Sequence, residues 1–367
     1  MKFSCNTNIL SEACLNVSRA VSTKSGTPAI EGICFKTVEQ GLELTGYDLE
    51  MGINTLVDAS IKEEGSTIIN AKTICEILKR LPGDIVYIET DERNICKITS
   101  GDSEFSIIGI SAEEYPELPY VMGGNPIVVD KRVLRDMIRQ TIFAVSVNDT
   151  RVVHRGIKFQ IANDEIKLIA LDGYRLAIRK EAINYKDEPI SFVVPAKTLS
   201  EIIKFVDDSE GYISMGLSRR HIVFSINGYN IVSRLLEGEF LDFTSAMPSS
   251  FVTEVSFKTA LMLDCADRMS LLSMDKVKSP LKCSFKEEQL KFSISTVIGS
   301  ANDLMPIRLE GESIEIGFNS RFLTDAVRAC DCDYVKMKLS GPLSPACIVP
   351  IEGDSFYYMV LPVRLRG

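Results

Sequence analysis

The chain has 367 residues, with hydrophobic residues at 45%, charged residues at 25% and a formal net charge of −9. These proportions are ordinary for a globular protein and exclude a disordered chain, and no apolar run reaches the roughly 20 residues that a membrane-spanning helix needs. The first residues lack a basic stretch followed by an apolar one, so we expect no secretory signal and a cytoplasmic location.

The first third of the chain reads as two similar halves, each a helix followed by strands. Residues 1–7 alternate like a strand. After it we predict a helix at 8–20, strands at 29–38, 41–46 and 51–57, a helix at 70–81, and strands at 85–90, 94–99 and 103–110. Glycines between the strands and the helix stop at Leu81-Pro82-Gly83 indicate these bounds.

The helix at 70–81 recurs later in the chain. Its sequence, Asn-Ala-Lys-Thr-Ile-Cys-Glu-Ile-Leu-Lys-Arg-Leu, is nearly repeated at 195–206, and a weaker copy begins at residue 319. In each copy apolar residues lie three and four apart, which predicts an amphipathic helix with one buried face. The repeat therefore predicts three similar domains, which we place at 1–122, 127–246 and 248–367.

The second and third domains follow breaks rich in proline, glycine and acidic residues, at 114–126 and 239–248. We predict helices at 130–146, 196–206, 257–272 and from 319. Strands are predicted at 157–162, 166–171, 175–180, 212–216, 221–226, 230–236, 281–286, 290–295, 307–309, 335–339, 346–350 and 356–361. Without βαβ alternation, this order predicts an α+β fold in which each domain packs two helices on antiparallel sheets.

A search for catalytic chemistry yields little. His154 and His221 are the only histidines, no nucleophile, Walker or dinucleotide-binding motif occurs, and we interpret His221 as structural. The ten cysteines contain no Cys-x-x-Cys, and the close pair Cys330 and Cys332 has no histidine nearby. We therefore expect no enzyme activity, no metal and no cofactor. A repeated α+β enzyme and a scaffold that binds no nucleic acid remain as competing classes.

The predicted helices carry an excess of positive charge, whereas the rest of the chain is strongly acidic. Lys72, Lys79, Lys197 and Lys204 recur between the copies, and Arg135 and Arg139 belong to a basic stripe of the helix at 130–146. Such residues are typical of solvated helix faces, but their repetition equally favours a face that binds a polyanion. No aromatic residues interleave with them, so contact with the backbone of duplex DNA fits better than base stacking.

Short motifs run through the whole chain in a specific order: residues 1–3 (Met-Lys-Phe), 44–51 (Leu-Thr-Gly-Tyr-Asp-Leu-Glu-Met), 170–177 (Ala-Leu-Asp-Gly-Tyr-Arg-Leu-Ala), 314–319 (Ile-Glu-Ile-Gly-Phe-Asn) and 360–365 (Val-Leu-Pro-Val-Arg-Leu). Through this series the chain resembles the bacterial DNA polymerase III beta subunits, the sliding clamps. The resemblance implies a head-to-tail homodimer whose domains close a ring around double-stranded DNA, with helices lining the hole. It also implies a DNA polymerase processivity factor that binds DNA without sequence specificity.

The resemblance also implies roles for individual residues. Matches to DNA-facing positions are Lys24, Lys72, Lys79, Asn148 and Lys197, to which the basic stripe adds Arg135 and Arg139. Matches to a groove for partner peptides are His154, Leu171, Gly173, Tyr174, Arg175, Leu176, Leu241, Ser245, Ala246, Met359, Leu361, Pro362 and Arg364. Matches to the dimer interface are Phe105, Leu271 and Leu272.

The groove is expected to be apolar, with Arg175 and Arg364 at its edges, and to bind a short peptide with Leu or Phe anchors. The implied partners are the replicative polymerase alpha subunit, the clamp loader, and repair and translesion polymerases. The chain departs from the family's pattern at this groove. His154 stands where an aliphatic residue is usual, Leu241 follows Phe240 where proline is usual, and Ser245-Ala246 replaces arginine and an aliphatic residue. Beside Phe105, Asp102 and Glu104 stand where some relatives have basic residues.

Overall fold

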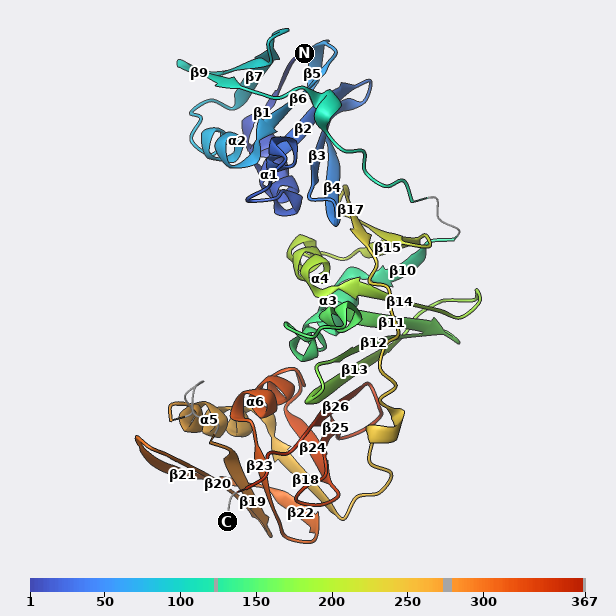
Figure 1. Ribbon diagram of the computed structural model, residues 1–367, viewed down its shortest axis with the longest axis vertical. Coiled ribbons are helices and arrows are strands. Elements are labelled where there is room, and N and C mark those ends of the chain that lie inside the picture. The colour runs from blue at the N-terminus through green and yellow to red at the C-terminus, as the bar shows by residue number, and fades with distance from the viewer. Residues whose placement is uncertain (122–124, 273–278, 366–367) are drawn as a thin grey trace. The chain divides into compact units, whose positions relative to one another are not determined.

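The computed structural model describes residues 1–121, 125–272 and 279–365. The chain forms two compact units, one of Met1–Lys131 with Ser200–Leu235 and the other of Arg132–Leu199 with Leu236–Gly367. The α-helices of the described residues are α1 (Thr7–Val17), α2 (Ala71–Leu78), α3 (Lys131–Arg139), α4 (Ala196–Ile202), α5 (Thr259–Ser270) and α6 (Ser320–Arg328). Within their units, α1 packs beside α2 and α5 beside α6 (Figure 1).

The first unit contains two antiparallel sheets. One has the strand order β5 (Ser60–Glu63), β1 (Lys2–Asn6), β7 (Ile85–Thr90), β8 (Ile95–Ser100) and β9 (Ser103–Ile108). The other has the order β10 (Ile127–Asp130), β15 (Tyr212–Leu217), β16 (His221–Ile226), β17 (Tyr229–Arg234), β4 (Met51–Val57), β3 (Gly41–Tyr47), β2 (Gly32–Val38) and β6 (Ser66–Asn70). The antiparallel pairing of β17 with β4 joins segments that are far apart in the sequence.

The second unit also contains two antiparallel sheets. The larger has the order β14 (Ile190–Pro195), β11 (Gly156–Ala162), β12 (Glu165–Leu171), β13 (Arg175–Ala182), β26 (Phe356–Val360), β25 (Ala346–Pro350), β24 (Tyr334–Leu339), β18 (Thr253–Lys258) and β22 (Arg308–Gly311). The smaller has the order β21 (Gly299–Pro306), β20 (Gln289–Thr296), β19 (Leu281–Lys286) and β23 (Ile314–Phe318). Here β13 pairs with β26, again between distant segments.

A motif of one strand, one helix and three further strands underlies both units. Every α-helix begins within one residue of the end of a strand, and three antiparallel strands follow it. The sequence predicted only the first of these preceding strands and missed β6, β10, β14, β18 and β23. These strands are four to six residues long, and the residues before the predicted helix starts at 70, 130, 196, 257 and 319 were assigned to no element. The strands β5 and β21 were also missed.

The buried helix faces agree with the predicted periodicity. In α2 the buried residues are Ala71, Ile74, Ile77 and Leu78, and in α6 they include Leu323, Ala326 and Val327. Each of these two helices begins after an asparagine whose side chain caps it, Asn70 and Asn319. The repeated segment thus forms an equivalent helix each time, with one face in the core.

The helix predicted at 130–146 is shorter than expected. α3 ends at Arg139, and a separate turn of 3₁₀-helix follows at Ile142–Ala144. The hydroxyl of Thr141 donates hydrogen bonds to the carbonyl groups of Met137 and Ile138, at 2.8 and 3.3 Å. The N–H of Thr141 donates to the carbonyl of Ile138 at 3.1 Å, an i to i−3 bond that tightens the chain after the last turn of α3. Likewise the predicted strand at 29–38 begins only at Gly32, because Pro28–Glu31 form a 3₁₀ turn.

The predicted domain boundaries fall partly outside the described residues, since residues 122 and 367 belong to undescribed segments. Between the predicted domains the strand pairs β4 with β17 and β13 with β26 make continuous sheets. The predicted central segment 127–246 therefore contributes strands to both compact units.

Candidate functional site

Helix α2 presents a charged stripe to solvent. Lys72, Glu76 and Lys79 lie at i, i+4 and i+7, all three are exposed, and the opposite face of the helix is buried. Glu76 forms an ion pair with Arg80, and its pKa is lowered by that hydrogen bond. Because Glu76 is already paired with Arg80, the stripe of α2 has an excess of positive charge.

Helices α4 and α6 repeat this stripe. Lys197, Glu201 and Lys204 occupy the equivalent positions around α4, and Arg321, Asp325 and Arg328 occupy those of α6. The acidic residue at each centre contacts another element: Glu201 lies 3.5 Å from Arg19, and Asp325 lies 2.7 Å from Arg175. Lys204, Arg321 and Arg328 were not among the predicted site residues, although the sequence repeat points to them.

The other predicted DNA-facing residues differ in exposure. Lys24 and Asn148 are exposed on the segments that follow α1 and α3, and Arg139 is exposed at the end of α3. Arg135 is not: its side chain is 15% exposed and its Nε donates to Asp136 at 2.9 Å. Of the two arginines that the stripe of α3 added, only Arg139 presents its charge to solvent.

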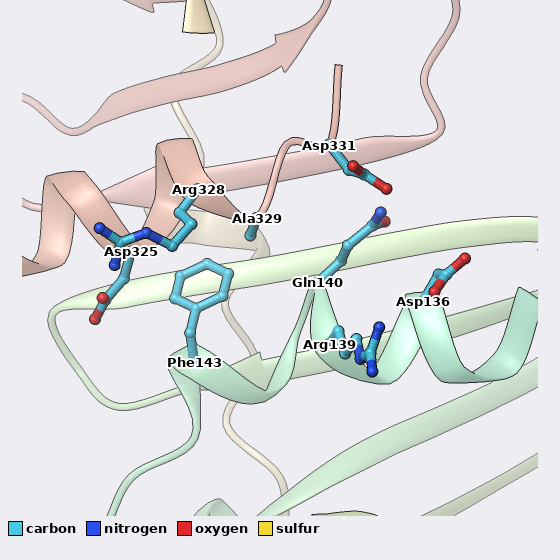
Figure 2. Close-up of a pocket in the computed structure, with 8 residues that line it drawn as sticks. All are labelled: Asp136, Arg139, Gln140, Phe143, Asp325, Arg328, Ala329 and Asp331. Atoms are coloured by element: carbon cyan, nitrogen blue, oxygen red, sulfur yellow. The ribbon is translucent and has the colours of Figure 1, made fainter. Parts of the chain in front are cut away.

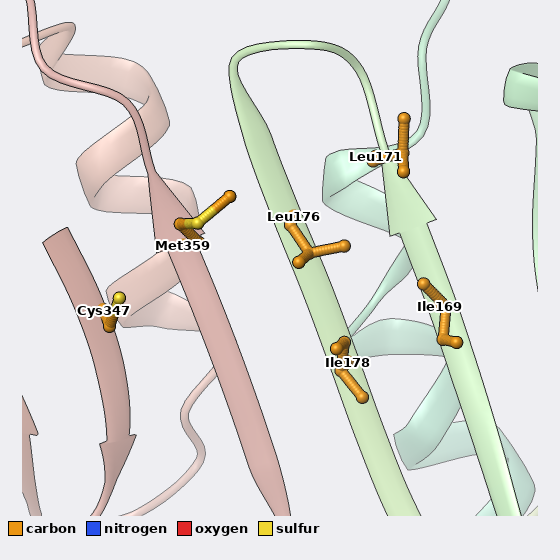
Figure 3. Close-up of a cluster of buried hydrophobic side chains, with 6 residues drawn as sticks. All are labelled: Ile169, Leu171, Leu176, Ile178, Cys347 and Met359. Atoms are coloured by element: carbon orange, nitrogen blue, oxygen red, sulfur yellow. The ribbon is translucent and has the colours of Figure 1, made fainter. Parts of the chain in front are cut away.

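Three residues expected in the peptide groove belong to a buried apolar cluster of the nine-stranded sheet. Leu171, Leu176 and Met359 lie together with Ile169, Ile178 and Cys347, on β12, β13, β25 and β26 (Figure 3). Phe240, Phe243, Phe251 and Tyr357 pack against this cluster. The first three of these aromatic residues come from residues 235–252, the segment between β17 and β18, which we call the strap.

The strap also carries three further predicted groove residues of the second domain. Leu241, Ser245 and Ala246 are exposed on it. The sequence reasoning missed that Phe240 and Phe243 pack against the apolar cluster. They lie in a coil segment, where the spacing of apolar residues follows no helical or strand period. Ile169 and Ile178 could have been found, because they alternate with Leu171 and Leu176 along the two strands.

His154 is completely buried next to the strap. Its Nδ1 lies 2.8 Å from Oδ2 of Asp149, and its ring meets that of Phe240 edge to face at 5.5 Å. The hydrogen bond from His154 lowers the pKa of Asp149 to about 2. An ionised carboxylate only accepts, so Nδ1 carries a proton. Among the described residues His154 Nε2 has no hydrogen-bond partner.

Arg175, which is expected at the edge of the groove, is largely enclosed. Its side chain is 9% exposed, with Nε at 2.9 Å from Asp172 and Nη1 at 2.7 Å from Asp325. The guanidinium group lies over the ring of Phe322 at 4.5 Å and near Phe143 at 5.5 Å. Two carboxylates and two aromatic rings therefore enclose this charge, and Arg175 connects β13 to α6.

The neighbouring predicted residues form a turn and the chain's C-terminal segment. Gly173, with φ +84°, and the exposed Tyr174 lie in the turn between β12 and β13, where Asp172 accepts the backbone N–H groups of Tyr174 and Arg175. The N–H of Leu361 donates to the carbonyl of Tyr174 at 2.8 Å. Pro362 and Arg364 follow, the latter exposed. The structure therefore brings Tyr174 and Leu361 together.

A cavity that the sequence did not predict lies where α3 and α6 end. It has a volume of about 350 Å³, and Arg139, Phe143, Asp325 and Arg328 are among its lining residues (Figure 2). Arginine and aspartate side chains together line it, so neither sign of charge dominates. In the described part of the chain no group of three His, Cys, Asp or Glu residues could hold a metal ion. No helix there is long and apolar enough to cross a membrane.

The predicted interface residues lie at two sheet ends. Phe105 is 38% exposed on β9, the outermost strand of the five-stranded sheet. Leu271 and Leu272 follow α5 directly, and Leu271 is 80% exposed. Helix α5 packs on β20 and β21, and β21 is the outermost strand of the four-stranded sheet.

Comparison with known proteins identifies the family. Models of the DNA polymerase III beta subunit match residues 1–119 (N-terminal domain), 128–242 (central domain) and 244–364 (C-terminal domain). The beta sliding clamp of Staphylococcus aureus is 32% identical over 356 residues, 94% of each chain.

Solved structures agree over the full length. The DNA polymerase sliding clamp from Bacillus subtilis matches with a TM-score of 0.97, 30% identity and 100% of both chains covered. The DNA polymerase beta subunit of Streptococcus pyogenes matches with a TM-score of 0.94 and 26% identity, again over 100% of both chains. The predicted α+β fold of three domains is thereby confirmed. The chain belongs to the DNA polymerase III beta subunit family, the sliding clamps, and is a processivity factor of DNA polymerase.

Proposed function

We propose that two copies of this chain close head to tail into a ring that encircles double-stranded DNA and tethers the polymerase to it. The ring itself catalyses no reaction, needs no cofactor and works in the cytoplasm. Its three domains are 1–122, 127–246 and 248–367, so the closed ring has six. The competing function is a scaffold that does not bind DNA. Such a scaffold would not explain why cationic stripes recur on several helices.

The observation that carries the ring is a pair of open sheet edges. β9 and β21 each end a sheet, and an outermost strand exposes backbone groups that can pair with another chain. Both edges carry exposed apolar side chains: Ile108 is 84% exposed on β9, and Leu304 is 57% exposed on β21. Two different edges that fit one another give a head-to-tail contact, and such contacts generate rings when the rotation closes.

Contact with DNA is assigned to the exposed cations of the helices. Lys72, Lys79, Lys197, Arg139 and the equivalent Arg321 can reach phosphate groups, which carry no sequence information. Lys24 and Asn148 add contacts from the segments that follow α1 and α3. Weak contacts suffice because a closed ring stays on DNA by topology, and weak contacts also let it slide.

Partner peptides are assigned to the surface above the apolar cluster, with the strap on one side and Tyr174, Leu361 and Arg364 on the other. Leu171, Leu176 and Met359 supply the apolar floor, and aromatic rings of the strap cover part of it. A peptide with Leu or Phe anchors suits such a surface. The partners we propose are the polymerase alpha subunit, the clamp loader, and repair and translesion polymerases that carry such a motif.

Retention on circular DNA tests the topological mechanism. The protein is loaded onto a nicked circular plasmid by a clamp loader, separated from free protein by gel filtration, and the plasmid is then linearised. We expect retention on the circle and loss from the linear form, because only free ends release a ring. Equal retention on both forms would refute encirclement, and no retention on either would favour the scaffold.

A further inference from the structure

We propose that Lys158 is a specificity-determining residue of the peptide groove and selects partner peptides that carry a carboxylate beside their apolar anchors. This inference rests on the proposed peptide groove. It adds to the groove a residue that the resemblance did not assign, together with the chemical class of side chain that this residue recognises.

Lys158 lies on the same face of the nine-stranded sheet as the apolar cluster. On β11 it pairs directly with Ile169 of β12, which in turn pairs with Ile178 of β13. Residues that pair directly across antiparallel strands project from the same face of a sheet. Ile169 and Ile178 belong to the cluster beneath the strap (Figure 3). The side chain of Lys158 therefore continues this row of the cluster on the β11 side.

The strap fixes the position of the Lys158 ammonium group. The Nζ atom lies over the ring of Phe240, 5.2 Å from the ring centroid, and the Lys158 side chain is half-buried. The same ring meets that of the fully buried His154 edge to face at 5.5 Å. Phe240 is thus held between Lys158 and His154. A cation over an aromatic face keeps most of its N–H groups available for a carboxylate.

The charge of Lys158 differs from that of its neighbours in having no carboxylate beside it. Two further lysines border the cluster on the same face, Lys167 on β12 and Lys180 on β13, and they pair directly with one another. Lys167 lies 2.8 Å from Glu165, and Lys180 binds Asp354. Within the described part of the chain, no carboxylate forms an ion pair with Lys158.

The acidic residue of the strap near Lys158 is already engaged in a turn. Asp242 accepts the N–H of Thr244 at 2.9 Å, at the start of the 3₁₀ turn Thr244–Ala246. Hydrogen bonds from Thr244 lower the pKa of Asp242 most, and the charge of Lys158 adds to this effect. The carboxylate of Asp242 therefore holds the turn of the strap, and Lys158 can bind a carboxylate that a partner supplies.

A peptide bound over the apolar cluster passes beside this ammonium group. An Asp or Glu next to its Leu or Phe anchors would form an ion pair with Lys158, whereas a Lys or Arg there would be repelled. Because Lys158 is half-buried beside apolar side chains, salt screens this pair less than it screens a fully exposed one. Lys158 thus separates acidic from basic peptides that have the same anchors.

Matched peptides test this preference. The probes are short fluorescein-labelled peptides with a Leu-Leu-Phe core, and they differ only in the residue next to the core, which is Asp, Asn or Lys. This residue precedes the core in one set and follows it in the other. Fluorescence anisotropy gives the Kd of each peptide for the full-length chain. In one set the Asp peptide should bind roughly fivefold more tightly than the Asn peptide, the contribution of a partly exposed ion pair.

Three variants show whether Lys158 causes the preference. In Lys158→Gln the preference for Asp should fall below about twofold, while the Kd of the Asn peptide stays unchanged because the groove is intact. Lys158→Glu should bind the Lys peptide more tightly than the Asp peptide. Lys167→Gln, in which the lost charge was paired with Glu165, is the matched control and should keep the preference of the unaltered chain.

The outcomes distinguish this inference from the groove on which it rests. If the unaltered chain binds none of the peptides, the groove and the role of Lys158 are overturned together. Binding without a preference for Asp, or a preference that survives in Lys158→Gln, would overturn the role of Lys158 and leave the groove standing. Equal weakening of all peptides by Lys158→Glu would show that Lys158 supports the strap and selects nothing.

Discussion

Asp149, which is hydrogen-bonded to His154 beside the strap, has a lowered pKa. Asp149 accepts hydrogen bonds from His154 Nδ1 and from the N–H of Arg151, both at 2.8 Å. These bonds lower its pKa from an ordinary value of about 4 to about 2. A pKa that is lower in the folded state gives stability that is present above the unfolded pKa and is lost as the pH falls through the folded one.

We predict that Asp149→Asn flattens the acid dependence of stability. In the unaltered chain the urea midpoint should fall between about pH 4 and pH 2, partly because Asp149 takes up a proton. The variant lacks this contribution and should change less across the same interval. Glu12→Gln, an exposed change on α1, is the control for the loss of one negative charge. Parallel curves for the variant and the unaltered chain would show that the pair has no part in acid stability.

Lys131 is the one lysine among the fully buried side chains of the described residues. Its ammonium group binds the carboxylate of Asp207 and the hydroxyl of Ser209, the latter at 2.6 Å. These contacts lower the pKa of Asp207 to about 2. Removing one partner of a buried charge costs more than replacing the charge by an apolar group of similar size.

We therefore predict that Asp207→Ala destabilises the protein more than Lys131→Met does. Lys131→Met should stay within about 1 kcal/mol of the unaltered chain, because the apolar side chain fills the same space. Asp207→Ala should lower the unfolding free energy by several times as much, since it leaves the ammonium group with only Ser209. Urea denaturation of both variants gives the comparison, and the reverse order would contradict this account.

At the scale of the helices, the asparagine caps allow a test of how much an N-cap side chain contributes to stability. Asn70 Oδ1 accepts the N–H of Thr73 at 3.1 Å, and Asn319 caps α6 in the same way, whereas Pro195 stands in the equivalent place before α4. Asn70→Ala should lower the unfolding free energy by about 1 kcal/mol, because it leaves a backbone N–H without its acceptor. Asn70→Asp keeps the acceptor and should be nearly neutral. If both variants lost the same unfolding free energy, the hydrogen bond from the cap would contribute nothing to stability.

The same elements show what the sequence could predict. Helical periodicity located α2, α4 and α6 and their buried faces, since burial of one stripe imposes that period. The helix starts after the missed strands β6, β10, β14, β18 and β23 were predicted to within two residues, but the strands themselves are only four to six residues long and too short to show a period of their own. The end of α3 at Arg139 was missed because apolar residues continue the helical period to Val145. At such a point the local sequence allows the helix either to continue or to end, and tertiary contacts determine which of the two occurs.

The candidate site was predicted less completely, because its contacts join distant segments. Arg175 was expected at the edge of the groove, and its contacts with Asp325 and Phe322, about 150 residues away in the chain, could not be predicted from local sequence. The strap supplies Phe240 and Phe243 without any periodic pattern. By contrast Leu171, Leu176 and Met359, which the resemblance assigns to the peptide groove, lie in one apolar cluster. They lie on regular strands whose alternation limits which face they occupy.

For the molecule as a whole, a net charge of −9 and a DNA-binding function are compatible only if the cations are concentrated in one kind of element. With the observed helix bounds some of the cations, such as Lys79 and Lys204, lie just after their helices rather than within them. The stripe of two cations around one acidic residue nevertheless recurs at α2, α4 and α6. In two copies an outer cation also pairs with the acidic residue, Lys204 with Glu201 at 2.7 Å and Arg321 with Asp325 at 3.9 Å, so contact with phosphate there would replace an ion pair within the stripe.

Replacing one equivalent cation in each stripe by a neutral residue tests whether electrostatic contacts or closure of the ring holds the protein on DNA. The variant carries Lys72→Gln, Lys197→Gln and Arg321→Gln, and the control carries Lys62→Gln, Lys186→Gln and Lys291→Gln, three exposed lysines outside the helices. The salt dependence of binding to a short duplex should become shallower by roughly 0.9 in the log–log slope for each phosphate contact removed.

Retention on a nicked circle at low salt should fall much less than binding to the short duplex, because a closed ring leaves a circle only by opening. The control variant should match the unaltered chain in both measurements. If the three stripe substitutions leave the salt slope unchanged, the stripes do not face DNA. If they abolish retention on the circle while the dimer persists, then contact and not closure holds the protein on DNA.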